Sequence, residues 1–231
     1  MPFIKSKKNL PVISTQKCGL RHTVISANGD EYTGEWLDNK KHGKGNYVCK
    51  KTGAIYAGEW KFGKRDGLGT YCVLLPESKT CSKKYDGEWK NGKKHGYGTY
   101  FYNNSEVYEG EWSEDQRSGR GRMHYLNGDF YEGDWMNDKI NGQGLMTFSN
   151  GTSYEGTWQD GKKNGDGKLY YRKKGMIYEG VWVDGAAKCG TLSNFGRDEA
   201  SEPAKYSFPE LHLVDAQLVL SEAQSALRDQ S

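Results

Sequence analysis

The chain has 231 residues, of which 31 are glycine and 13% are aromatic, and its formal net charge is +3. The apolar fraction of 35%, aromatics included, leaves too few aliphatic side chains for a conventional central core. So small a net charge gives no reason to expect nucleic acid as a partner.

The first segment, residues 1–27, lacks the apolar stretch of a secretory signal, and no part of the chain approaches the roughly 18 apolar residues of a membrane span. The five cysteines form no Cys-x-x-Cys pair and no zinc-ligand spacing, which favours reduced thiols. We therefore expect a soluble, cytoplasmic protein without a metal or other cofactor. The sequence LRHTVISANGD (20–30) predicts one extra edge strand at about 22–26, entering an Asn-Gly turn.

One motif, Y-x-G-x-W, then recurs between residues 28 and 195 and uses all seven tryptophans. These are spaced by 23 or 24 residues, apart from one step of 29, and are Trp36, Trp60, Trp89, Trp112, Trp135, Trp158 and Trp182. Such a fixed period predicts a repeat array, here of seven repeats. Side chains of a strand alternate between its faces, so Tyr108, Gly110 and Trp112 share one face, and Glu109 and Glu111 the other.

Each motif except the last is followed by a Gly-x-Gly that opens a second strand, as at Gly119 and Gly121. Large residues such as Met123 and Tyr125 follow on the same face. We expect Tyr and Trp rings from adjacent strands to lie over the bare glycine backbone, so that a ladder of rings replaces a globular core. Short polar turns join the strands, which predicts an all-β, elongated, single-layer antiparallel meander.

The combination of Y-x-G-x-W and Gly-x-Gly at this period resembles the MORN repeat (membrane occupation and recognition nexus), over about residues 32–191. The resemblance implies a single-layer sheet with a curved groove that docks proteins or, in some members, lipid headgroups. It also implies an adaptor or scaffold in sperm development or in cilia and flagella, with the acrosomal vesicle or flagellum as expected locations. The last repeat departs from the pattern, because Cys189 and Thr191 replace its two glycines.

Basic residues recur four and five positions after the tryptophans. They are Lys40, Lys41, Lys64, Arg65, Lys93, Lys94, Arg117, Lys139, Lys162 and Lys163. The repeat geometry predicts that they line one long edge of the sheet. The simpler interpretation is exposed turn chemistry that also blocks edge pairing. The alternative is a basic edge that binds anionic phospholipids or an acidic partner segment.

The aromatic face is the other candidate binding surface, because exposed apolar patches usually mark binding sites. We expect peptide or helical segments of partner proteins to dock on its central repeats. The residues assigned to this surface are Tyr102, Trp112, Tyr125, Tyr131, Trp135, Phe148 and Trp158. The carboxylates of the opposite face are interpreted as a solvated strand face rather than as acid, base or metal ligands.

The sequence contains no catalytic constellation that we recognise. The predicted function is therefore a non-enzymatic, protein-binding scaffold or adaptor, with a peripheral membrane adaptor as the alternative.

Two further stretches interrupt or follow the repeats. Six extra residues in LLPESKTCSKK (74–84) account for the long tryptophan step and are predicted to form a loop. In the tail, residues 196–231, VDAQLVLSEAQSALRDQ (214–230) predicts a helix at about 215–228, with Asp215 as its N-cap. An open sheet leaves two edges, and we expect a homodimer through the weakly charged first strand, with the tail helix as the competing interface.

Overall fold

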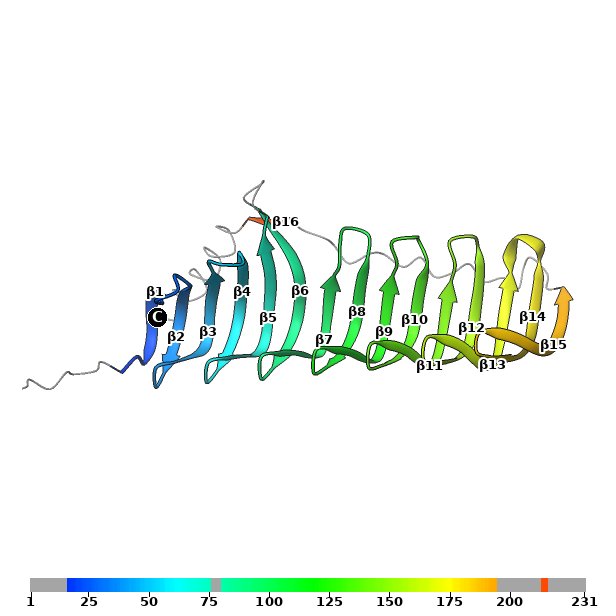
Figure 1. Ribbon diagram of the computed structural model, residues 1–231, viewed down its shortest axis with the longest axis horizontal. Coiled ribbons are helices and arrows are strands. Elements are labelled where there is room, and N and C mark those ends of the chain that lie inside the picture. Colours follow the sequence, from blue (N-terminus) through cyan, green and yellow to red (C-terminus); the bar gives the residue numbers. More distant parts are fainter. Residues whose placement is uncertain (1–15, 76–79, 195–212, 216–231) are drawn as a thin grey trace, which may run out of the picture.

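The computed structural model describes residues 16–75, 80–194 and 213–215. Fifteen strands form one sheet in which each pairs antiparallel with its neighbours in the chain, which confirms the predicted meander (Figure 1). The strands are β1 Gly19–Ile25, β2 Glu31–Leu37, β3 Lys40–Cys49, β4 Ala54–Lys61, β5 Lys64–Leu74, β6 Thr80–Lys90, β7 Lys93–Phe101, β8 Val107–Ser113, β9 Gln116–His124, β10 Phe130–Met136, β11 Lys139–Thr147, β12 Thr152–Gln159, β13 Lys162–Tyr171, β14 Met176–Val183 and β15 Ala186–Asn194. A short 3-10 helix, η1 Arg172–Lys174, links β13 to β14, and a sixteenth strand, β16 Leu213–Asp215, pairs with β6.

The structure tests one expectation about the segments outside the regular repeats and leaves a second largely untested. The six-residue insertion mostly extends the β5–β6 hairpin, because Leu74 still pairs with Cys81 and each strand reaches 11 residues. It is therefore largely strand rather than loop. The predicted tail helix lies outside the described residues, except that its proposed cap, Asp215, belongs to β16. In the described part of the chain, no helix is long and apolar enough to cross a bilayer.

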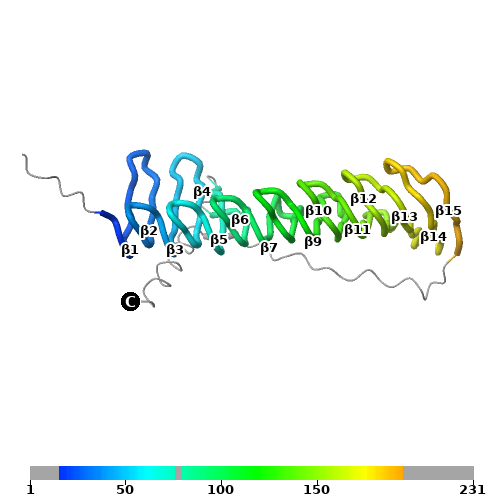
Figure 2. The backbone as a smooth tube through the Cα atoms, turned by 90° about the horizontal axis from the view of Figure 1, so that it is seen from below, coloured from blue at the N-terminus to red at the C-terminus, as the bar shows by residue number. Residues whose placement is uncertain are grey.

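The turns inside the repeats are two residues long and have left-handed backbone at both positions. Asp38 and Asn39 have φ angles of 49° and 62°, and Glu114 and Asp115 have 53° and 73°. Turns of this kind match the right-handed twist of the strands they connect, which keeps adjacent strands in register. Figure 2 shows the outcome from below, with successive hairpins stacked along one long axis.

Each repeat also contains a shift in pairing register just before its tryptophan. Between β8 and β9, Gly110 pairs with Gly121, but Trp112 pairs with Arg117, so β9 has extra residues at this point. Bulges of this type bend a strand and increase its twist. In Figure 1 the strands stand upright in one row and their lower ends curve toward the long axis of the molecule.

The predicted ladder of rings is confirmed on one face, called here the aromatic face. Tyr108 lies edge-on to the tryptophan of its own repeat, Trp112, at 5.1 Å and to that of the next, Trp135, at 5.3 Å. Tyr32, Tyr56, Tyr85, Tyr131 and Tyr154 each make the same two contacts. A Cβ on Gly121 would overlap the hydroxyl of Tyr108, which explains the glycine column as predicted.

Candidate protein-binding surface

The polar atoms of the ladder are tied to the backbone. The Tyr108 hydroxyl donates to the carbonyl of Glu111 at 2.9 Å, and Trp112 Nε1 donates to the carbonyl of Gly98 at 3.0 Å. The tyrosine bond recurs in six repeats and the tryptophan bond in five. Buried Tyr and Trp rings need such partners. The ring nitrogens of the two end tryptophans, Trp36 and Trp182, are buried without one, whereas the five tryptophans between them are all bonded, so the central part of the ladder is a rigid platform with satisfied ring nitrogens.

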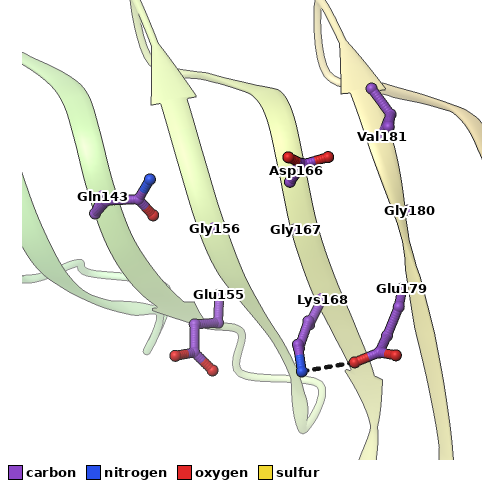
Figure 3. A pocket seen from close by; sticks show the side chains of 9 residues that line it. All are labelled: Gln143, Glu155, Gly156, Asp166, Gly167, Lys168, Glu179, Gly180 and Val181. Atoms are coloured by element: carbon purple, nitrogen blue, oxygen red, sulfur yellow. Dashed lines mark ion pairs between the residues drawn. The ribbon is translucent and has the colours of Figure 1, made fainter.

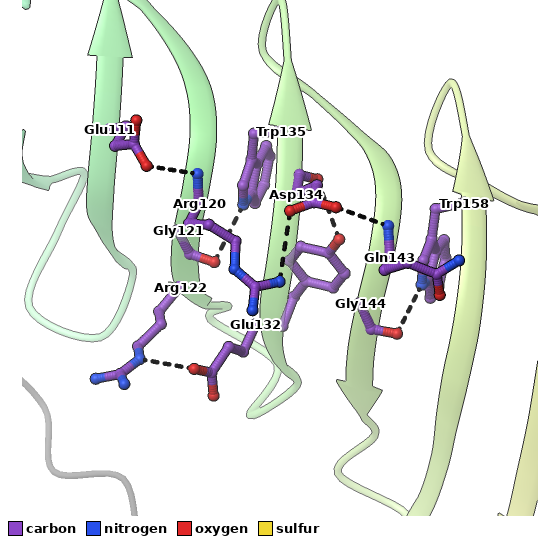
Figure 4. Close-up of polar contacts among 11 residues, drawn as sticks. Glu111, Arg120, Gly121, Arg122, Glu132, Asp134, Trp135, Gln143, Gly144 and Trp158 are labelled. Carbon is purple, nitrogen blue, oxygen red and sulfur yellow. Dashed lines mark hydrogen bonds and ion pairs between the residues drawn. The ribbon is translucent and has the colours of Figure 1, made fainter. Parts of the chain in front are cut away.

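The acidic residue before the tryptophan has a structural role that the sequence interpretation missed. Glu111 accepts a hydrogen bond from the backbone N–H of Arg120 at 3.0 Å, and Asp134 does the same for Gln143 at 2.9 Å (Figure 4). Glu35 and Glu88 bind equivalent N–H groups. A carboxylate thus stabilises the bulge at the Gly-x-Gly, so these acids lie at the surface, as expected, but also have a structural role.

The signal for this role was present in the sequence. An acid precedes the tryptophan in the first five repeats, but Thr157 and Val181 take its place in the last two. The sequence pattern does not show the register shift, however, and it is this shift that brings the acidic side chain to a backbone N–H of the following strand.

The residues predicted to form the protein-binding face divide into two groups. Trp112, Tyr131, Trp135 and Trp158 are buried in the ladder and offer almost no surface to a partner. Tyr102 is 38% exposed, and Tyr125 and Phe148 are partly buried. These last three occupy equivalent positions of consecutive repeats, and we call them the aromatic row. Their role in docking stays a prediction.

The basic residues form two columns rather than one edge, because neighbours in a strand point to opposite faces. The inner column lies over the aromatic rings: Lys94 Nζ is 4.0 Å from the ring centre of Trp112, and the Arg117 guanidinium is 4.3 Å from that of Trp135. Lys41, Arg65 and Lys163 take the same position over Trp60, Trp89 and Trp182. Burial lowers the pKa of Lys94 and Lys163, and lowers that of Lys41 to about 8.

The outer column consists of the exposed residues Lys40, Lys64, Lys93, Lys139 and Lys162. Lys93 pairs with Glu114 at 2.6 Å, and Lys139 with Asp160 at 2.9 Å. Lys162 similarly lies 3.5 Å from Asp184. Each acid comes from the turn of the next repeat, so the positive potential of this edge is partly neutralised. The binding of anionic lipid by this edge remains a prediction.

The face opposite the aromatic rings carries mixed charges. Near its C-terminal end it contains an open hollow of about 560 Å³ with Glu155, Asp166 and Lys168 on its walls. Lys168 pairs with Glu179 at 2.6 Å across neighbouring strands (Figure 3). Within the described ranges, no three His, Cys, Asp or Glu side chains gather as metal ligands would.

Comparison with known proteins identifies the same repeats that the hairpins of the sheet show. The family model described as "MORN repeat" matches residues 32–52, 56–72, 85–107, 108–130, 131–153 and 154–176. The chain belongs to the MORN repeat family. These matches cover the hairpins that carry the Tyr–Trp ladder, and the β14–β15 hairpin continues the sheet beyond them.

The chain is also similar to curated MORN-family proteins from several vertebrates. It is 52% identical over 233 residues to MORN repeat-containing protein 3 of Xenopus laevis, covering 98% of each chain. It is 64% identical over 215 residues to the Homo sapiens protein of that name, covering 92% of this chain and 89% of that one. One solved structure with some likeness is the SAS-4 TCP domain of Drosophila melanogaster in complex with a proline-rich motif of Ana2. The sequence identity is 14%, the aligned part covers 73% of this chain and 91% of that chain, and the TM-score is 0.27. That likeness is too low to guide an inference.

Proposed function

We propose that this MORN protein is a non-enzymatic scaffold that docks an extended segment of a partner protein along its aromatic face. The observation that carries the proposal is the aromatic row, in which Tyr102, Tyr125 and Phe148 keep accessible surface above a buried ladder. A rigid platform of this kind loses little conformational entropy when a ligand binds.

The repeat spacing favours a particular ligand pattern. Equivalent rings lie two strands apart, which is about 9.6 Å at ~4.8 Å per strand. A segment in the extended polyproline II conformation rises about 3.1 Å per residue and has three residues per turn, so every third side chain points the same way and one turn spans about one repeat. A ligand lying along the sheet would thus place a large apolar side chain against the row at every third position.

The charge beside the row favours acidic residues between those apolar positions. The cationic groups of Lys94 and Arg117 lie over the ladder next to it, at 4.4 Å from the ring centre of Tyr100 and 4.3 Å from that of Trp135. Complementary charge contributes to the rate and specificity of association more than to affinity.

A peptide-display library with large apolar residues at every third position, selected on the full chain, supplies the ligand for the test. The double substitution Tyr102→Ala and Tyr125→Ala should weaken the selected peptide's binding by about tenfold or more, the loss expected for aromatic anchors. Tyr97→Ala is the matched control, because Tyr97 is 51% exposed on the opposite face. Failure to select a binder, or equal dissociation constants for all three proteins, would contradict the proposal.

A further inference from the structure

The two-residue turns inside the repeats line up along one edge of the sheet, at the lower ends of the strands in Figure 1. In the later repeats, the outer lysine of one repeat pairs with an acid at the first turn position of the next, as Lys139 does with Asp160 at 2.9 Å. The same step from Lys40 leads to Phe62, and a Cβ on Gly63 would lie 4.0 Å from that of Lys40. Lys40 is therefore left without the acid that neutralises the later lysines.

The second and third turns also place like charges opposite each other. Lys61 pairs with Lys64 across the β4–β5 hairpin, and Lys90 pairs with Lys93 across β6 and β7. Like charges at directly opposed positions destabilise a sheet. Lys93 is compensated by its ion pair with Glu114. Within the described ranges, four exposed lysines of the first three turns form no ion pair, namely Lys40, Lys61, Lys64 and Lys90.

An exposed aromatic side chain lies among these lysines on a strained backbone. Phe62 has a φ of 49° at the first turn position and is 54% exposed. The left-handed region is unfavourable for a bulky residue, and turns of this type favour Asn, Asp or Gly there. The equivalent residues of the other six repeats are all polar: Asp38, Asn91, Glu114, Asn137, Asp160 and Asp184. A residue that is both strained and more than half exposed stabilises the fold poorly, which indicates a role in binding.

Contacts with β3 fix the orientation of Phe62. Its backbone N–H donates to Nδ1 of His42 at 3.4 Å, and the centres of the two rings lie 5.2 Å apart. Gly63 is tied to the same strand, because its N–H donates to the carbonyl of Lys41 at 2.8 Å. The phenyl ring is therefore a preorganised apolar anchor among positive charges. We call this group the turn patch: Lys40, Lys61, Phe62, Lys64 and Lys90.

The turn patch has the charge and the length that suit a short acidic ligand. Turns of successive repeats are two strands apart, or about 9.6 Å, so the first three turns extend over about 19 Å. An extended segment covers that distance with about six residues at ~3.3 Å each. Acids bound the patch on both sides, because Asp38 accepts from Gln16 Nε2 at 2.7 Å and Glu114 pairs with Lys93. A broad anionic surface such as a membrane would also meet these acids, whereas a short segment would not.

We propose that the turn patch binds an acidic segment of a partner protein, about six residues long, that places one large apolar side chain against Phe62. Carboxylates on either side of that chain pair with the lysines of the patch. The site is separate from the aromatic row, because Tyr102 comes directly after the end of β7, whereas the turns lie where β7 begins. It adds a second contact surface to the docking proposed above.

A labelled model peptide tests the site in the full chain. The probe is a fluorescein-labelled heptapeptide with a central tryptophan and glutamate at every other position, and its binding is followed by fluorescence anisotropy. Phe62→Asn should weaken binding by about tenfold, the loss expected for an aromatic anchor. The urea midpoint of this variant should stay the same or rise, because asparagine suits the left-handed turn position. Its weaker affinity would therefore not come from loss of the fold.

Matched charge variants test the lysines. Lys61→Gln together with Lys64→Gln should weaken binding by about fivefold at low salt, the effect expected for two exposed charges. Lys139→Gln together with Lys162→Gln removes the same charge from lysines that already pair with acids, and should change the affinity by less than about twofold. Tyr102→Ala should leave the affinity unchanged, because that side chain belongs to the aromatic row.

Other results would overturn the proposal. If the heptapeptide does not bind at low salt, or binds the two double-lysine variants equally, the patch is not a specific site. An effect of Tyr102→Ala as large as that of Phe62→Asn would place the probe on the aromatic row. Flotation with phosphatidylserine vesicles at physiological salt that Phe62→Asn abolishes would show that the patch binds a membrane instead.

Discussion

The contact between Tyr108 and Gly121 provides a sharp test of how the ladder is held together. The Cβ introduced by Gly121→Ala would overlap the tyrosine hydroxyl and lie 2.6 Å from the ring carbon Cζ. The ring cannot easily move away, because its hydroxyl is bonded to the Glu111 carbonyl at 2.9 Å and its edges contact Trp112 and Trp135. Adding one methyl group here must therefore displace several rings.

Overpacking a close-packed site costs about 1–3 kcal/mol, and we expect about 3 kcal/mol for Gly121→Ala because backbone and ring are both fixed. The control is Gly161→Ala, at a turn glycine with φ 81° and no atom within 4 Å of the new Cβ. At position 161 only the left-handed backbone disfavours alanine, which should lower the free energy of unfolding by about 1 kcal/mol. The free energy of unfolding is measured by urea denaturation followed by tryptophan fluorescence.

A double-mutant cycle with Tyr108→Phe separates the steric clash from other effects. Removing the hydroxyl removes the atom nearest the new methyl group, so the cost of Gly121→Ala should fall by about 1 kcal/mol in the Tyr108→Phe background. The cost of Gly161→Ala should not change. Additive free energies for the first pair, or a loss below about 0.5 kcal/mol for Gly121→Ala, would refute the packing argument.

Four further outcomes follow from the described contacts. Glu111→Ala should lower the free energy of unfolding by about 1 kcal/mol by leaving the Arg120 N–H without its carboxylate, and an unchanged urea midpoint would contradict the bulge assignment. Burial raises the pKa of Tyr125 and Tyr154 to about 12, so the stability they contribute below pH ~10 is lost as the pH rises through their folded values. The exposed tyrosines, such as Tyr97, should ionise first, and the remaining rise in absorbance at 295 nm, from the buried tyrosines, should come in one cooperative step together with the loss of circular dichroism. Complete tyrosine ionisation while the circular dichroism is unchanged would argue against it. Because the outer lysines are paired with acids, flotation with anionic vesicles should show binding at low salt that is lost at physiological salt, and binding that survives there would favour the membrane adaptor. Light scattering should give about twice the 26.1 kDa chain mass, falling to a monomer without residues 1–27; a full-length monomer would reject the homodimer.

Much of the architecture is readable from the residue pattern because its determinants are local. The period of the tryptophans gives the repeat, and alternation along the strand puts Tyr108, Gly110 and Trp112 on one face. Short turns force consecutive strands to pair, so the meander and its Tyr–Trp ladder need no long-range information. The glycine column follows from the same alternation, since the rings of one strand meet the backbone of the next.

The separation of the basic residues into two columns could also have been predicted, because adjacent residues of a strand, such as Lys93 and Lys94, point to opposite faces. What alternation does not show is that Lys94 lies over Trp112 of the next repeat while Lys93 reaches Glu114. Likewise, the bond from the Arg120 N–H to Glu111 requires the register shift at the bulge. These contacts depend on how far each strand bends, which no single repeat determines alone.

The tertiary structure alone decided which aromatic and apolar side chains remain accessible. Trp112 and Tyr102 are both aromatic residues of the repeats, yet Trp112 is buried between Tyr85 and Tyr108, whereas Tyr102 is exposed. The pairing of Val214 with Cys81 joins segments far apart in the chain and outside the repeat period. Periodicity reports only interactions between neighbouring repeats, whereas this contact depends on a strand edge that one insertion left open.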